Sequence, residues 1–163
     1  MTDNINYLVE ECLIQHEGGE KFFDAIDEKL RNDKLLLTMM IGKVLEQKSF
    51  DYIIVSGHFG NVFKSFCQKN FDQELGKNII VTNGGLRKNN SITTFWKDYD
   101  IENKNIIFID DSFYLGRTRD KIKSAIEEHH GKFVCTYVFY DGSKIKDPLV
   151  HSFYRYYDHY NVD

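Results

Sequence analysis

The stretch NIIFIDDSFYLGRT spans residues 105 to 118. Its apolar run, residues 106 to 109, leads directly into two carboxylates, Asp110 and Asp111; Gly116 and Thr118 follow, and a helix-like pattern begins. This order predicts a buried strand that ends in a polar loop and opens a helix. Ligands of open α/β sheets bind at the carboxyl ends of strands, and a helix N-terminus offers free N–H groups to an anion. Carboxylates suit hydroxyl groups or a metal ion. A sugar phosphate fits both features.

Strands and helices are predicted to alternate around this stretch. Two helices are expected first, over residues 20–30 and 33–47. Strands are then expected at residues 52–55, 79–81, 106–109 and 133–139, with helices marked by apolar positions at 62–67 and 122–126 and a helix end at Gly131. The pattern predicts an α/β fold, Rossmann-like, with a mostly parallel sheet of four or more strands flanked by helices.

Composition narrows the class of protein. The chain has 163 residues, and one domain, 1–163, is expected: N-terminal helices in 1–48, a core in 50–140 and an aromatic tail in 141–163. A net charge of −4 does not indicate nucleic-acid binding, which usually requires an excess of basic residues. Three scattered cysteines predict neither a disulfide framework nor a zinc site. No apolar run approaches membrane-spanning length and no signal pattern is visible, so a cytoplasmic protein without membrane contact is expected.

The segment 105–118 resembles the 5-phosphoribosyl-1-pyrophosphate (PRPP) motif of the type I phosphoribosyltransferases. The resemblance implies that Asp110 and Asp111 are the catalytic pair that holds the ribose hydroxyls. It also implies that residues 112–118 wrap the 5-phosphate, through Ser112, Gly116, Arg117 and Thr118. The sequence departs from the motif just before the glycine, where Tyr114 and Leu115 replace small hydroxyl residues.

The same resemblance places further substrate contacts on two other loops. The turn after the first strand, SGHFG, lies where the family binds pyrophosphate, which implies that role for Ser56, Gly57, His58 and Gly60. Two glycines there let the backbone approach an anion closely, and His58 could donate to a phosphate oxygen or shuttle a proton. A tight strand-to-helix turn without a ligand is the alternative interpretation. Arg87 and Lys88 follow the second strand, where the family often keeps a basic residue near pyrophosphate.

The resemblance implies a reaction and its partners. Ribose 5-phosphate would pass from PRPP to a nucleobase or a related nitrogen nucleophile, with Mg²⁺ accompanying the pyrophosphate. The polar segment 83–105 falls where the family carries a mobile loop, and a homodimer is consistent with the family. A non-catalytic domain of the same fold, used for nucleotide sensing or partner binding, is the alternative. The aromatic tail predicts either a lid over a base or rings packed against the sheet edge.

Overall fold

The computed structural model describes residues 25, 28–30, 32–47, 49–82 and 98–155. The predicted helix over 20–30 lies mostly outside this part of the chain, as do Arg87, Lys88 and most of the polar segment 83–105. None of the helices in the described part is long and apolar enough to cross a membrane.

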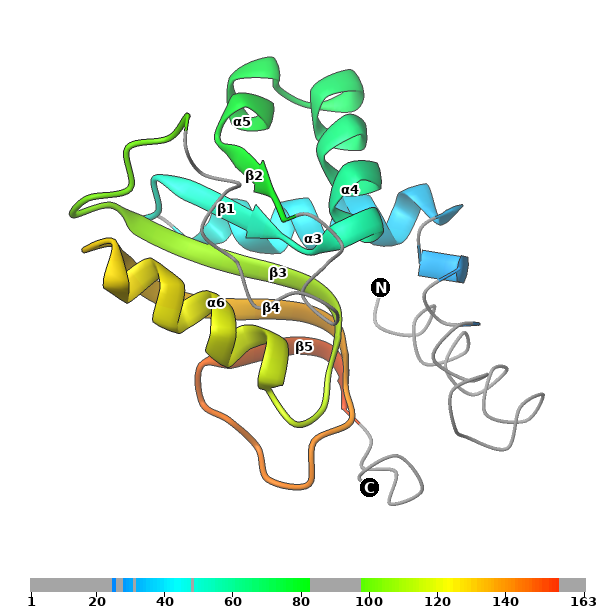
Figure 1. Ribbon diagram of the computed structural model, residues 1–163. Coiled ribbons are helices and arrows are strands. Elements are labelled where there is room, and N and C mark those ends of the chain that lie inside the picture. The colour runs from blue at the N-terminus through cyan, green and yellow to red at the C-terminus, as the bar shows by residue number, and fades with distance from the viewer. Residues whose placement is uncertain (1–24, 26–27, 31, 48, 83–97, 156–163) are drawn as a thin grey trace.

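Five parallel strands form one sheet in the order β2-β1-β3-β4-β5. Figure 1 shows this sheet with its helices. The elements in chain order are α3 (Lys34–Glu46), β1 (Tyr52–Val55), α4 (Gly57–Asn70), α5 (Gln73–Lys77), β2 (Ile79–Val81), β3 (Asn105–Phe113), α6 (Arg117–Glu128), β4 (Lys132–Asp141) and β5 (Val150–Arg155). The predicted α/β class and the parallel sheet are therefore confirmed.

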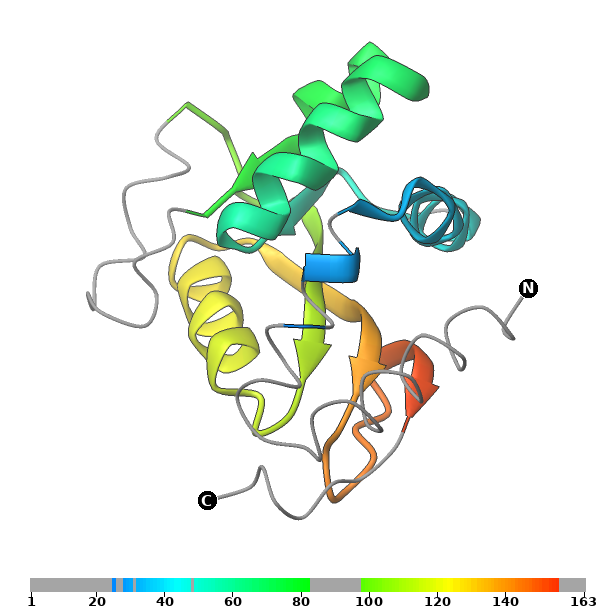
Figure 2. The same ribbon diagram turned by 90° about the vertical axis from the view of Figure 1, so that its right-hand side faces the viewer.

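Two apolar layers hold the helices on the sheet. One cluster joins α3 and α4 to strand residues such as Ile107 and Ile109, and the other joins α6 to Ile106 and Phe108. Alternate residues of β3 thus face opposite layers, as a strand buried on both faces requires. Figure 2 shows α6 and α3 on opposite sides of the strands.

The end of α6 differs in detail from the prediction. The left-handed residue is His130, with φ 60, rather than Gly131. The Gly131 amide donates to the Ile126 carbonyl at 2.9 Å, which is the Schellman pattern with glycine one place later. Glycine is required there for space, because an added Cβ would lie 2.8 Å from Ile126 Cγ2.

Strand β5 extends the sheet beyond the core predicted for residues 50–140. Its register pairs Thr136 with Val150 and Asp141 with Arg155. The rings of Phe153 and Tyr154 stack on β4 aromatics at centroid distances of 5.7 and 5.9 Å. These two tail aromatics therefore pack on the sheet, while the rest of the tail aromatics, residues 156–160, lie outside the described part.

Strand lengths at the carboxyl edge shape the region of the predicted site. Strand β1 pairs with β3 only as far as Val55 opposite Ile109. Strand β3 continues beside β4 to Phe113, which pairs with Asp141. The expectation that the strand ends before Asp110 is wrong, because β4 keeps β3 extended for four more residues, 110 to 113. The acidic pair lies on this overhang, beyond the last β1 residue.

Candidate functional site

The acidic pair lies on the overhang of β3, the part of this strand that continues beyond its pairing with β1. Both carboxylates are partly exposed. The Asp111 amide donates to Asp110 Oδ1 at 2.9 Å, and Ser112 Oγ donates to Asp111 Oδ1 at 3.0 Å. These contacts orient the two carboxylates, and an ionised carboxylate, with about four acceptor positions, is suited to accept hydroxyl hydrogens. Ser112 thus supports the pair in this structure.

A three-residue loop, 114–116, connects the acidic overhang to α6. Gly116 is the N-cap and has φ 72, a left-handed conformation that favours glycine. The N-cap glycine has no side chain to cap the helix, and the first backbone bond of α6 runs from the Asp120 amide to the Gly116 carbonyl at 2.8 Å. The amides of residues 117–119 precede that bond and can face an anion. Thr118 is half-buried and Arg117 is exposed.

Tyr114 packs into the core although it sits in the predicted phosphate loop. Its ring lies 5.7 Å from the Tyr140 ring, centroid to centroid, and belongs to the layer under α3 and α4. Gly142 makes room for it, because an added Cβ would lie 2.3 Å from Tyr114 Cε1. Leu115, in contrast, is 47% exposed. The departure from the motif at position 114 therefore serves the core, whereas nothing in the structure explains position 115.

The turn after β1 is stabilised by a hydrogen bond to Thr82, the residue that follows β2. Gly57 has φ 48, and its amide donates to the buried Thr82 hydroxyl at 3.1 Å. Gly60 is buried against β1, because an added Cβ would lie 3.0 Å from Val55 carbonyl atoms. Gly57 thus allows the left-handed turn, and Gly60 allows α4 to pack closely against β1. Ser56 is the N-cap of α4 without a side-chain cap bond, and His58 is exposed.

The sheet order brings these two loops together. An order of β2-β1-β3-β4-β5 reverses direction between β1 and β3, and ligands bind outside the carboxyl ends of the strands at such a switch point. Residues 56–60 and 110–118 follow or end the two strands at that point. Arg87 and Lys88 lie outside the described residues, so their place in the site stays a prediction. Within the described residues, no three His, Cys, Asp or Glu side chains gather as a metal site.

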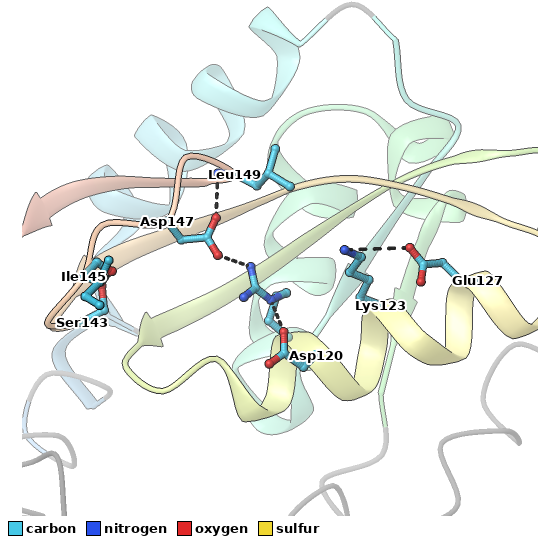
Figure 3. A network of polar contacts seen from close by, with 8 residues as sticks. Asp120, Lys123, Glu127, Ser143, Ile145, Asp147 and Leu149 are labelled. Atoms are coloured by element: carbon cyan, nitrogen blue, oxygen red, sulfur yellow. Dashed lines mark hydrogen bonds and ion pairs between the residues drawn. The ribbon is translucent and has the colours of Figure 1, made fainter.

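Sequence reasoning missed two residues that support this edge. Thr82 orders the β1 turn, and a lone threonine after an apolar strand gave no signal for it. Arg119 lies in the first turn of α6 and packs over the Phe113 ring at 5.2 Å. Its guanidinium donates to Asp147 Oδ2 at 2.8 Å and to Asp120 Oδ1 at 2.6 Å, as Figure 3 shows for Asp147 and Asp120.

The charges of this pair stabilise each other. Burial is the largest single influence and raises the pKa of Asp147, but the hydrogen bonds from Arg119 and the Leu149 amide, together with the charges of Arg119 and Lys123, outweigh it, and the net pKa lies below the usual value. The pKa of Arg119 is raised: burial lowers it, and the bonds to Asp147 and Asp120 more than compensate. Both side chains are thus charged over the physiological pH range.

Comparison with solved structures gives the same fold at low identity. A hypoxanthine-guanine phosphoribosyltransferase from Bacillus anthracis is 15% identical, with 80% of each chain covered and a TM-score of 0.50. A hypoxanthine phosphoribosyltransferase from Staphylococcus aureus is 17% identical, covering 84% of this chain and 80% of that one, with a TM-score of 0.50. A hypoxanthine-guanine-xanthine phosphoribosyltransferase is 13% identical, covering 84% and 77%, also at 0.50.

The matched structures differ in how much of their own length this chain covers. Against the Leishmania donovani UMP synthase, at 16% identity and a TM-score of 0.46, the chain covers 24% of that protein's length and 79% of its own. No protein-family model matches the sequence, and no curated protein matches it significantly. The fold of the chain is that of the phosphoribosyltransferases.

Proposed function

We propose that this chain transfers ribose 5-phosphate from PRPP to a nitrogen nucleophile and releases pyrophosphate. One observation carries the proposal. The acidic pair Asp110–Asp111 lies on the β3 overhang, five residues, 112–116, separate it from the start of α6, and both lie at the switch point of a phosphoribosyltransferase fold. Carboxylates suited to hydroxyls and amides suited to a phosphate thus occur on one connected segment, as the two ends of a sugar phosphate require.

Each part of the site has a role in this proposal. Asp110 and Asp111 accept the ribose hydroxyls, and the amides that follow Gly116 hold the 5-phosphate, helped by the Thr118 hydroxyl. The β1 turn, residues 56–60, lies on the other side of the switch point and takes the pyrophosphate. His58 is the exposed side chain of that turn that can donate to a phosphate oxygen.

The proposed step balances without a protein nucleophile. The bond from C1 of the ribose to the pyrophosphate oxygen breaks, and its electron pair leaves with pyrophosphate. The acceptor nitrogen forms the new C1–N bond and gives up one proton. Site groups contribute by positioning the reactants and by neutralising the charge that develops on pyrophosphate. Arg87 and Lys88 are proposed for that charge from their place in the sequence.

Mg²⁺ would enter with the substrate. This ion keeps several waters and binds through one or two carboxylates together with substrate phosphates. In the described part of the chain, the partly exposed acidic pair could supply such carboxylates. Asp110 or Asp111 could then contact it through water.

Calorimetry with PRPP and Mg²⁺ tests the proposal directly. We expect saturable binding that Asp110→Asn with Asp111→Asn removes. A panel of nucleobases should then give pyrophosphate release with at least one base. Absence of PRPP binding by the folded wild-type protein would refute the proposed function.

A non-catalytic binding domain is the second candidate. The observation in its favour is the loop itself, where Tyr114 is committed to the core and the exposed Leu115 cannot donate a hydrogen bond. Such a domain would bind a nucleotide or PRPP without releasing pyrophosphate with any base. The same two measurements separate the candidates, because binding without turnover supports the second one.

A further inference from the structure

The crossover from β4 to β5, residues 142–149, joins two parallel strands without a helix. Parallel strands usually need a crossover of a dozen or more residues, most often a helix. A shorter path suffices here because β5 begins opposite Thr136, so the chain returns along β4 only from Asp141 to that level. That distance is about 17 Å, and residues 142–149 can span about 28 Å when extended. The crossover is long enough but has no internal helix to stabilise it.

Side chains hold this crossover at both ends instead. At the β4 end, the buried Asp141 accepts from the Ser143 amide at 2.9 Å and pairs with Arg155 Nε at 3.3 Å. At the β5 end, Asp147 accepts from the Leu149 amide at 2.8 Å and from Arg119 at 2.8 Å. Figure 3 shows Asp147 of the crossover reaching toward the first turn of α6.

Of these contacts, the Arg119–Asp147 pair is the one that joins the crossover to α6. The two side chains are 13% and 25% exposed, and Arg119 directly follows Thr118 in the first turn of α6. The guanidinium also covers Phe113, the last residue of β3. One side chain thus touches the end of the acidic strand, the start of the anion-binding helix and the crossover.

The crossover lies on the side of β3 from which an acceptor would approach. Strand β3 has β1 on one side and β4 on the other. The proposed function places pyrophosphate at the turn after β1. A direct displacement at a sugar carbon brings the nucleophile to the face opposite the leaving group, which is the β4 side. The Gly142 amide donates to the Phe113 carbonyl at 2.9 Å, so the crossover starts beside the end of β3.

We propose that Arg119 is a positioning residue that, through Asp147, holds the 142–149 crossover against the start of α6 and so sets the acceptor side of the site. This inference rests on the proposed function. The role is one of positioning, because Arg119 Nε donates to Asp120 and Nη1 donates to Asp147 of the crossover. Its loss should therefore affect ligands that reach beyond the ribose more than ligands that end there.

Two kinds of probe separate these effects in calorimetry. Ribose 5-phosphate fills the acidic pair and the α6 start only, while a nucleoside 5′-monophosphate (AMP, GMP, IMP, UMP or CMP, whichever binds the wild type most tightly) also reaches the acceptor side. For Arg119→Met and Asp147→Asn we expect nucleotide affinity to fall about tenfold and ribose 5-phosphate affinity by less than about twofold. Arg119→Lys should recover part of the loss, because it keeps the charge without the fork geometry.

Glu127→Gln is the matched control for Asp147→Asn. Glu127 pairs with another α6 cation, Lys123, at 4.0 Å, and both side chains are more exposed than those of the Arg119–Asp147 pair. It should leave both affinities unchanged. Hydrogen exchange of residues 142–149 should quicken in Arg119→Met and Asp147→Asn but not in Glu127→Gln.

The outcomes distinguish this inference from the proposed function. If the wild type binds both probes and Arg119→Met weakens them equally or not at all, the positioning role is wrong and the proposed function stands. If the folded wild type binds neither probe nor PRPP, the proposed function fails and the inference fails with it. A selective loss of nucleotide affinity in both variants, absent from Glu127→Gln, supports the inference.

Discussion

Gly116→Ala should weaken both the fold and the anion site, because Gly116 combines a left-handed backbone with a crowded position. Its φ is 72, and an added Cβ would lie 3.1 Å from Phe113 Cζ and 3.2 Å from Arg119 Nη2. A left-handed conformation costs a residue with a Cβ roughly 1–2 kcal/mol. The arginine end can move, but moving it disturbs the stack on Phe113. We therefore expect the free energy of unfolding to fall by about 2 kcal/mol.

Gly42→Ala is the matched control, with the opposite sign. Gly42 lies inside α3, and an added Cβ would meet nothing within 4 Å. Alanine in a helix interior is more stable than glycine by roughly 0.5–1 kcal/mol. Gly116→Asn is a second control, because asparagine tolerates the left-handed region better than alanine and should lose less stability.

Thermal unfolding and ribose 5-phosphate titration measure both consequences. For a chain of this size, about 2 kcal/mol lowers the melting temperature by roughly 4–8 °C. Ribose 5-phosphate affinity should fall only in the Gly116 variants, because the displaced backbone carries the first amides of α6. A Gly116→Ala protein that melts at or above the wild-type temperature would refute the backbone argument. Unchanged ribose 5-phosphate affinity would refute the placement of the anion.

Three further predictions test the site and the core. Asp110→Asn with Asp111→Asn should abolish sugar-phosphate binding in calorimetry while circular dichroism stays native, since each charge-assisted bond contributes roughly 1.5–3 kcal/mol; retained affinity in the folded double variant would contradict the role of the pair. Leu115→Thr should strengthen PRPP binding by roughly 0.5–1.5 kcal/mol if a hydroxyl can reach the phosphate, whereas adding Tyr114→Thr should also lower the melting temperature, because that ring packs in the core; no gain from Leu115→Thr favours the non-catalytic candidate. Burial raises the pKa of the Cys67 thiol to about 12, so iodoacetamide at pH 8 should alkylate it only after unfolding in urea; rapid labelling of the native protein, read by mass spectrometry, would contradict its burial.

Local sequence signals were sufficient to predict the bounds of β1 and β2. The strands at residues 52–55 and 79–81 have the predicted bounds, because short apolar runs between turn signals have few alternatives to a buried strand. The acidic pair was selected as a candidate for the same reason, since two carboxylates directly after such a run are easily recognised. The alternation of strand and helix then fixed the parallel class.

Tertiary effects account for what the sequence did not predict. Strand β5 was missed because its residues, VHSFYR, mix polar and aromatic side chains and no helix precedes it. The overhang of β3 depends on pairing with β4, which a local pattern does not contain. Thr82 and Arg119 act through contacts 25 and 28 residues distant in the chain, so their roles follow only from the folded arrangement.

The position of Tyr114 changes how the divergent phosphate loop should be judged. Replacing two hydroxyl donors removes hydrogen bonds of roughly 0.5–1.5 kcal/mol each. In return, the ring of Tyr114 packs on Tyr140 and closes over Gly142, and an aromatic pair of this kind adds about 0.5–1.5 kcal/mol beyond its buried area. A loop fixed in this way has less conformational freedom to lose when an anion binds, which offsets part of the missing hydrogen bonding. The loss of the hydroxyls therefore does not by itself argue against PRPP binding; the exposed Leu115, which gives the core nothing comparable, is the stronger argument for a changed ligand.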